Sequence, residues 1–82
     1  MKLPRDLLGA DLAKALEKLG YHETRKKGSH IRLTTGQGGE HHVTVPDHDS
    51  LRVGTLSAIL SDVAEHFGMS RDELMRELFG AD

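Results

Sequence analysis

The chain has 82 residues, of which 37% are hydrophobic and 29% charged, and its formal net charge of −2 is typical of one globular domain over residues 1–82. It contains no cysteine, which excludes disulfides, thiolate zinc sites, iron–sulfur clusters and cysteine nucleophiles. No apolar run reaches the ~20 residues of a membrane span and residues 1–6 lack the apolar stretch of a signal peptide, so we expect a cytoplasmic protein with no membrane contact.

The first predicted element is an amphipathic helix over residues 7–19. Its apolar residues recur at helical spacing on one face: Leu8, Leu12, Ala15, Leu16 and Leu19. Gly20 is expected to end the helix as a C-cap. At the start, Asp6 or Gly9 is expected to act as the cap, and Asp11 suits the first turn, where a negative charge is favoured.

Residues 21–46 change to the alternating pattern of strands. Ile31 and Leu33 alternate with polar residues, as do Val43 and Val45. Two turn signals separate the segments: Gly28-Ser29, and the glycine-rich stretch 35–40. The pattern predicts three short antiparallel strands in a meander, whose apolar face must be covered by helices.

Two helices are predicted to follow. Residues 53–67 keep an unbroken helical spacing and end at Gly68. Ser70 and Glu73 then form the sequence signature of a capping box, which starts a third helix that runs to about Phe79. The order α-β-β-β-α-α predicts an α+β fold with a three-stranded antiparallel sheet and helices on one face.

Positive charge gathers near the first turn of this sheet. Residues 1–34 hold eight Lys/Arg against four Asp/Glu, a balance of +4, whereas residues 35–82 hold three against nine, a balance of −6. Four of the cations surround the glycine turn: Arg25, Lys26, Lys27 and Arg32. By the alternation, His30 and Arg32 point away from the apolar face, and His42 joins them if the third strand pairs with the second. A basic sheet face without helices suits an RNA backbone.

A histidine on such a face has a clear chemical use. Histidine is the side chain best suited to move a proton at neutral pH. RNA carries its own nucleophile, the 2′-OH, so a ribonuclease needs no metal if it can move protons and stabilise the phosphorane charge. Spacing alone favours a simpler interpretation, a solvated basic turn followed by a polar strand residue, His30, because basic patches are common.

The other histidines give weaker signals. His41 and His42 point to opposite faces of one strand and cannot easily bind the same ion, so a metal site is not favoured. The simplest interpretations are an exposed strand start for His41, a turn residue for His48, and surface positions for His22 and His66. The helix start at residues 51–56 has free N–H groups that suit a phosphate, although an ordinary helix start is the simpler interpretation.

Five segments together resemble the HicA family of mRNA-interferase toxins from bacterial toxin–antitoxin pairs. They are Met1–Asp6, Ala15–Tyr21, Arg25–His30, Val43–His48 and Gly54–Leu60, in the order of the family. The resemblance implies a fold similar to double-stranded-RNA-binding domains, ribonuclease activity on mRNA and a HicB-like antitoxin partner. The active histidine of the family follows a Gly-Ser pair, which here assigns that role to His30.

The combined hypothesis is a metal-independent endoribonuclease without a cofactor. His30 acts as general base or acid, and His48 is the candidate for a second proton-transfer group. The predicted RNA-binding residues are Arg25, Lys26, Lys27, Gly28, Ser29 and Arg32. Lys27 and Arg32 bind phosphate, while Arg25 and Lys26 steer RNA toward the site. Two other classes remain open at this point: a non-catalytic double-stranded-RNA-binding module and a protein-interaction module.

Overall fold

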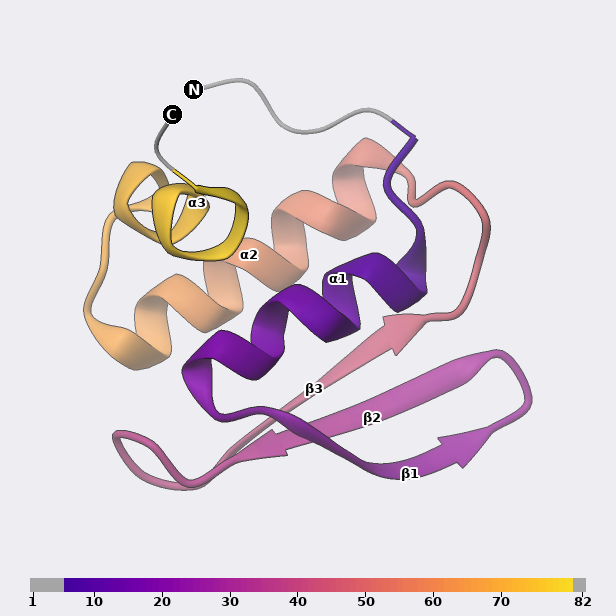
Figure 1. The fold of residues 1–82 in the computed structure, drawn as a ribbon, viewed down its shortest axis with the longest axis horizontal. Helices are drawn as coiled ribbons and strands as arrows, with labels where there is room; N and C mark the ends of the chain where they lie inside the picture. The colour runs from indigo at the N-terminus through magenta and orange to yellow at the C-terminus, as the bar shows by residue number, and fades with distance from the viewer. Residues whose placement is uncertain (1–5, 81–82) are drawn as a thin grey trace.

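The computed structural model describes residues 6–80, which form one three-stranded sheet and a layer of helices. The elements are α1 (Gly9–Leu16), the 3-10 helix η1 (Glu17–Leu19), β1 (His22–Lys27), β2 (His30–Thr35), β3 (His41–Pro46), α2 (Val53–Phe67) and α3 (Arg71–Phe79). The strands are antiparallel in the order β1-β2-β3. The helices lie on one side of the sheet (Figure 1), so the predicted α+β fold is confirmed.

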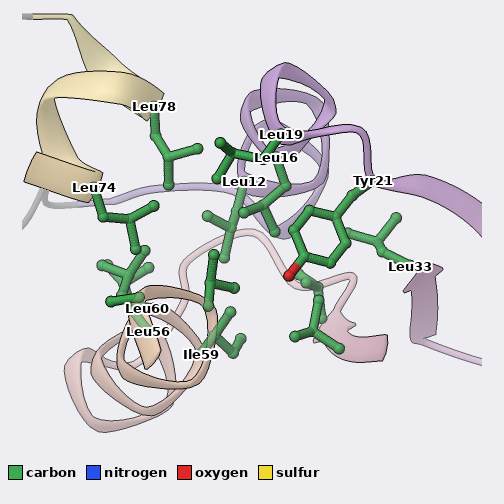
Figure 2. Close-up of a cluster of buried hydrophobic side chains, with 14 of the residues drawn as sticks. Leu12, Leu16, Leu19, Tyr21, Leu33, Leu56, Ile59, Leu60, Leu74 and Leu78 are labelled. Carbon is green, nitrogen blue, oxygen red and sulfur yellow. The ribbon is translucent and has the colours of Figure 1, made fainter. Parts of the chain in front are cut away.

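The apolar stripes of helices and strands meet in a single core (Figure 2). On the sheet, the inward-facing residues Ile31, Leu33, Val43 and Val45 are all buried, as the alternation predicted. The helices contribute mainly leucines, among them Leu12, Leu16, Leu56, Leu60, Leu74 and Leu78. Each buried side chain of this size contributes about 1.5–3 kcal/mol relative to exposure. This burial fixes which face of the sheet is covered.

The first helix differs from the prediction at its start and in its last turn. It begins at Gly9, with Leu8 in the N-cap position and no side chain capping it, so neither Asp6 nor Gly9 is the cap. A tertiary contact replaces the cap, because the Gly9 amide donates a hydrogen bond of 2.9 Å to the carbonyl of His48. At the other end the helix tightens into η1 before Gly20, whose left-handed φ of +84° ends it as predicted.

The two C-terminal helices follow the predicted signals. α2 ends at Gly68, which adopts a left-handed conformation. Ser70 and Glu73 form the expected capping box: the Glu73 amide donates to Ser70 Oγ, and the Ser70 amide donates to the Glu73 carboxylate. These hydrogen bonds lower the pKa of Glu73. Within residues 6–80, no helix is long and apolar enough to cross a membrane.

Gly9 is a position where only glycine fits. A Cβ at residue 9 would lie 1.9 Å from the carbonyl oxygen of Pro46, which is a backbone atom and cannot rotate away. We expect Gly9→Ala to destabilise the protein by about 1–3 kcal/mol, measured by urea unfolding, because α1 must move off the end of β3.

Gly54 provides the matched control. It lies in the first turn of α2, and a Cβ there meets nothing within 4 Å. Gly54→Ala is expected to leave stability unchanged or raise it by up to about 1 kcal/mol, since alanine is the better helix former. Equal stability of the Gly9→Ala and Gly54→Ala variants would contradict the close packing of α1 on β3.

Candidate functional site

The sheet face opposite the helices, called here the open face, carries three rows of side chains set by strand register. Directly paired residues share a face, so each row runs across the three strands. The rows are Lys27, His30 and Pro46; then Arg25, Arg32 and Thr44; then His22, Thr34 and His42. The first two rows therefore combine three cations with His30, as the alternation predicted.

His30 lies at the start of β2 and follows the Gly28-Ser29 turn, whose backbone is accessible from solvent. The residue is exposed, and no side chain among residues 6–80 forms a hydrogen bond with its ring. Gly28 in the preceding turn has a φ of +58°, and a Cβ there would meet nothing within 4 Å. The Gly28-Ser29 turn is thus accessible to a ligand from outside. The predicted exposure of His30 on the face away from the core is confirmed.

His48 lies at the same end of the sheet as His30. It is exposed, in the connection between β3 and α2. The adjacent Asp47 amide donates a hydrogen bond of 2.6 Å to the carbonyl of Ser29, which joins this connection to the turn before His30. A hollow at this end is lined by Pro46, His48, Ser50, Leu51, Arg52 and Thr55. The start of α2, which borders the hollow, has no side-chain cap and no acidic residue in its first turn.

Lys26 is separated from the other predicted RNA-binding cations. It pairs in register with the buried Ile31, so its side chain leaves the strand on the helix side. There its Nζ lies 2.9 Å from the Asp47 carboxylate, which raises the pKa of the lysine through a hydrogen bond and charge attraction. Arg25, Lys27 and Arg32 remain together on the open face.

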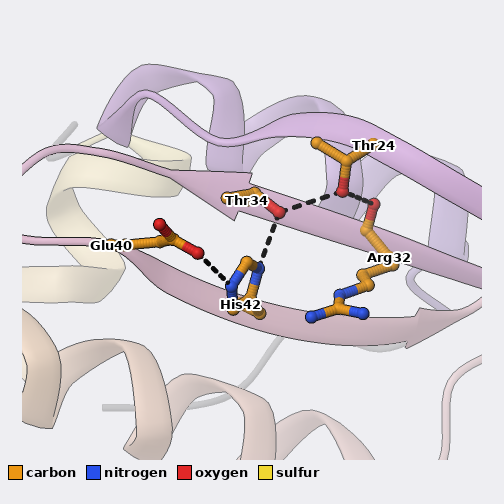
Figure 3. Close-up of polar contacts among 5 residues, drawn as sticks. All are labelled: Thr24, Arg32, Thr34, Glu40 and His42. Carbon is orange, nitrogen blue, oxygen red and sulfur yellow. Dashed lines mark hydrogen bonds and ion pairs between the residues drawn. The ribbon is translucent and has the colours of Figure 1, made fainter.

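The third row contains a hydrogen-bonded chain that the sequence analysis did not find (Figure 3). His42 Nε2 lies 2.7 Å from Glu40 Oε2, and His42 Nδ1 lies 2.8 Å from Thr34 Oγ1. The hydroxyl of Thr24 lies 2.9 Å from that of Thr34 and donates a longer bond to the carbonyl of Arg32. Glu40 and His42 are two residues apart, the spacing that places side chains on one strand face, but Glu40 precedes β3 and lies in the glycine-rich loop that the sequence predicts.

A second group of histidines lies on the helix side of the sheet. His41 Nδ1 shares a hydrogen bond of 2.7 Å with the hydroxyl of Tyr21, and His41 Nε2 donates to Asp62. The His66 ring stacks on the His41 ring at 4.4 Å and donates a hydrogen bond to the carbonyl of Gln37. His41 starts β3 as predicted, but its side chain is only 18% exposed, so the prediction of an exposed residue is wrong. His66 is half-buried in the last turn of α2 and is held by contacts that a plain surface position did not predict. Their partners are 20–29 residues away in sequence, where local patterns give no signal.

The histidines of β3 do not gather metal ligands. His41 and His42 lie on opposite faces of the strand, as the alternation predicted. Across residues 6–80, no three His, Asp or Glu side chains are grouped to hold a metal ion.

These features define a class: an α+β domain with the helix and strand order of double-stranded-RNA-binding domains and a basic, helix-free sheet face. The chain belongs to the HicA family, because the family model described as HicA toxin of bacterial toxin–antitoxin matches residues 9–64. The match includes His30 and His48 together with all three strands. No curated protein and no solved structure matches the chain.

Tyr21, the buried partner of His41, offers a direct test of this group. Burial, reinforced by the charge of Asp62, raises the pKa of Tyr21 to about 12. An unfolded tyrosine ionises near pH 10, so the folded state disfavours the phenolate. The corresponding stability is fully present below about pH 10 and is lost as the pH rises toward 12.

The chain has one tyrosine and no tryptophan, so ultraviolet absorbance of the phenolate reports this residue alone. We expect the folded protein to titrate about two pH units above the same chain in guanidinium, with unfolding monitored in parallel. Identical midpoints in the two states would show that Tyr21 is not held in the core.

Proposed function

We propose that this HicA family member is a metal-independent endoribonuclease toxin that cleaves mRNA in the cytoplasm and acts as a single domain. One observation carries the proposal: His30 is an exposed imidazole with no side-chain partner among residues 6–80, placed in a row with Lys27 and next to the row of Arg25 and Arg32. A titratable ring beside fixed cations on an open face is suited to a phosphodiester whose oxygens the cations neutralise.

The proposed reaction uses the nucleophile that RNA supplies. A base removes the proton of the 2′-OH, the 2′-oxygen attacks the adjacent phosphorus, and the bond to the 5′-oxygen breaks as that oxygen receives a proton. The products are a 2′,3′-cyclic phosphate and a free 5′-OH, so atoms and charges balance. Lys27 and Arg32 stabilise the charge that develops on the phosphorane oxygens.

One imidazole cannot remove and deliver a proton in the same step. We propose His48 as the second proton-transfer group, supported by its exposed position at the end of the sheet where Asp47 joins Ser29. The backbone of Gly28 and Ser29 and the start of α2 border the same region. Either histidine serves as base in this scheme, with the other as acid.

We propose further that a HicB-like antitoxin neutralises the toxin by covering His30. The family is one of toxin–antitoxin pairs, which supports an antitoxin partner. The open face supplies three cations in two adjacent rows. A partner that presents carboxylates to these rows would exclude RNA from the same surface by both charge and bulk.

His30→Ala is expected to lower the rate of RNA cleavage at least about 100-fold, because a positioned acid or base contributes 10²–10⁴-fold. The assay uses purified protein, labelled RNA and a metal chelator, and it identifies the 2′,3′-cyclic phosphate end. His22→Ala is the matched control: His22 is also exposed on the open face but lies in the third row. It should cleave RNA nearly as fast as the wild type.

Three results would change the assignment. Equal cleavage by wild type and His30→Ala would remove His30 from the mechanism. Cleavage by the wild type that stops only with chelator would indicate a metal-dependent enzyme. Retention of RNA by the wild type without any cleavage would identify the non-catalytic binding module instead.

The two lysines on either side of β1 should differ in RNA binding. We expect Lys27→Ala to weaken binding of uncleavable 2′-O-methyl RNA and to reduce the slope of log K against log salt by about 0.7, the value of one phosphate contact to a single strand. Lys26 also carries a predicted steering role, but its pairing with Asp47 on the helix side predicts a smaller change for Lys26→Ala. Binding measured between 50 and 200 mM salt separates the variants. Equal slopes would exclude the open face as the RNA-binding surface.

A further inference from the structure

His42 is the most constrained side chain of the open face. Both of its ring nitrogens are occupied, Nε2 by the Glu40 carboxylate and Nδ1 by the hydroxyl of Thr34. The carboxylate can only accept, so Nε2 carries the proton that points at Glu40. Thr34 is itself held by Thr24. The ring therefore presents one N–H donor in a fixed direction, with an anionic oxygen already bound to it.

Glu40 is held less firmly than the ring that it contacts. Its side chain is 74% exposed, against 38% for His42. It belongs to the segment between β2 and β3, which contains Gly36, Gly38 and Gly39. Glycine gives the backbone of this segment more conformational freedom, and an exposed contact between a histidine and a carboxylate adds little to stability. Another anion can thus replace the carboxylate at small cost while Thr34 keeps the ring in place.

Arg32 supplies a second donor beside this ring. It pairs with Thr44, so His42 is its diagonal neighbour across β2 and β3, a separation that long side chains can bridge. Figure 3 shows the Arg32 guanidinium extending over β3 on the same side of the sheet as the His42 ring. The Glu40 contact of Nε2 lies on the other side of the ring from the guanidinium, so the two donors suit neighbouring phosphates of one RNA strand.

The register places His42 at a defined distance from His30. Pro46 is opposite His30 and Thr34 is opposite His42, so the two histidines are four residues apart along the strands, or about 13 Å. This separation is too large for both to act on one phosphate, and the cations of the second row lie between them. RNA bound along β2 would reach both positions.

We propose that the Nε2–H of His42 forms a second phosphate-binding subsite for RNA, next to the site that Arg32 serves, and that Glu40 occupies this subsite as an internal anion until RNA displaces it. This inference rests on the proposed RNA substrate, and it adds a competing carboxylate that weakens binding of longer RNA. His42 is a positioning residue in this scheme, because it contacts the RNA strand at a point distant from the bond that is cleaved.

The test measures binding of 2′-O-methyl RNA of twelve and of three nucleotides to the full chain. Glu40→Gln keeps an acceptor for His42 but removes the charge, and we expect it to bind the twelve-nucleotide RNA about two- to fivefold more tightly, the effect of losing one weak competing surface contact. The three-nucleotide RNA should show no gain. His42→Asn should weaken binding of the longer RNA only.

Glu65→Gln is the matched control, since Glu65 is an exposed carboxylate on α2 and its removal changes the net charge equally. At physiological salt, charges beyond about 8 Å are screened, so its effect should be small. A parallel NMR titration should shift the His42 ring signals with the longer RNA. Equal effects of Glu40→Gln and Glu65→Gln, or unmoved His42 signals at saturation, would overturn the subsite while leaving the nuclease intact. Failure of every variant to bind RNA would overturn both.

Discussion

The structure depends on the burial of one face of a three-stranded sheet. Side chains alternate along a strand, so the packing of Ile31, Leu33, Val43 and Val45 under the helices forces their neighbours to the other side. The same contacts that stabilise the fold therefore expose His30, Arg32 and His42 together. A shift of one residue in register would exchange the two sets, at the cost of the whole core.

Packing at one end of the sheet positions residues of the proposed site, as the burial of one face does. At the end that holds His30, three segments meet: the Gly28-Ser29 turn, the connection that holds His48, and the start of α1. The Asp47 amide donates to the Ser29 carbonyl and so joins the connection to the turn. Gly9, at the start of α1, packs against the Pro46 carbonyl at a distance that leaves no room for a Cβ. This packing places His48 near the proposed site although it belongs to no strand or helix.

The six histidines divide into groups with different surroundings. His41 and His66 are stacked and tied to Tyr21, Asp62 and Gln37 on the helix side, where they fasten the loop between β2 and β3 to α2. On the open face, His42 is tied to Glu40 and Thr34, whereas His30 has no side-chain partner among residues 6–80. A ligand can therefore reach the His30 ring without displacing a side chain of residues 6–80, whereas at His42 it must compete with Glu40.

The sequence by itself determined the α+β class, the meander, the helix ends at Gly20 and Gly68, the capping box of Ser70, and the exposure of His30. These features depend on side-chain alternation and on residues close along the chain. Only the tertiary structure decided that Leu8 is an N-cap without a capping side chain, that Lys26 turns to Asp47, and that Glu40 holds His42. Each of these depends on contacts between segments or on a loop geometry that spacing does not specify, because local sequence patterns describe which face a residue occupies and not which distant group it meets there.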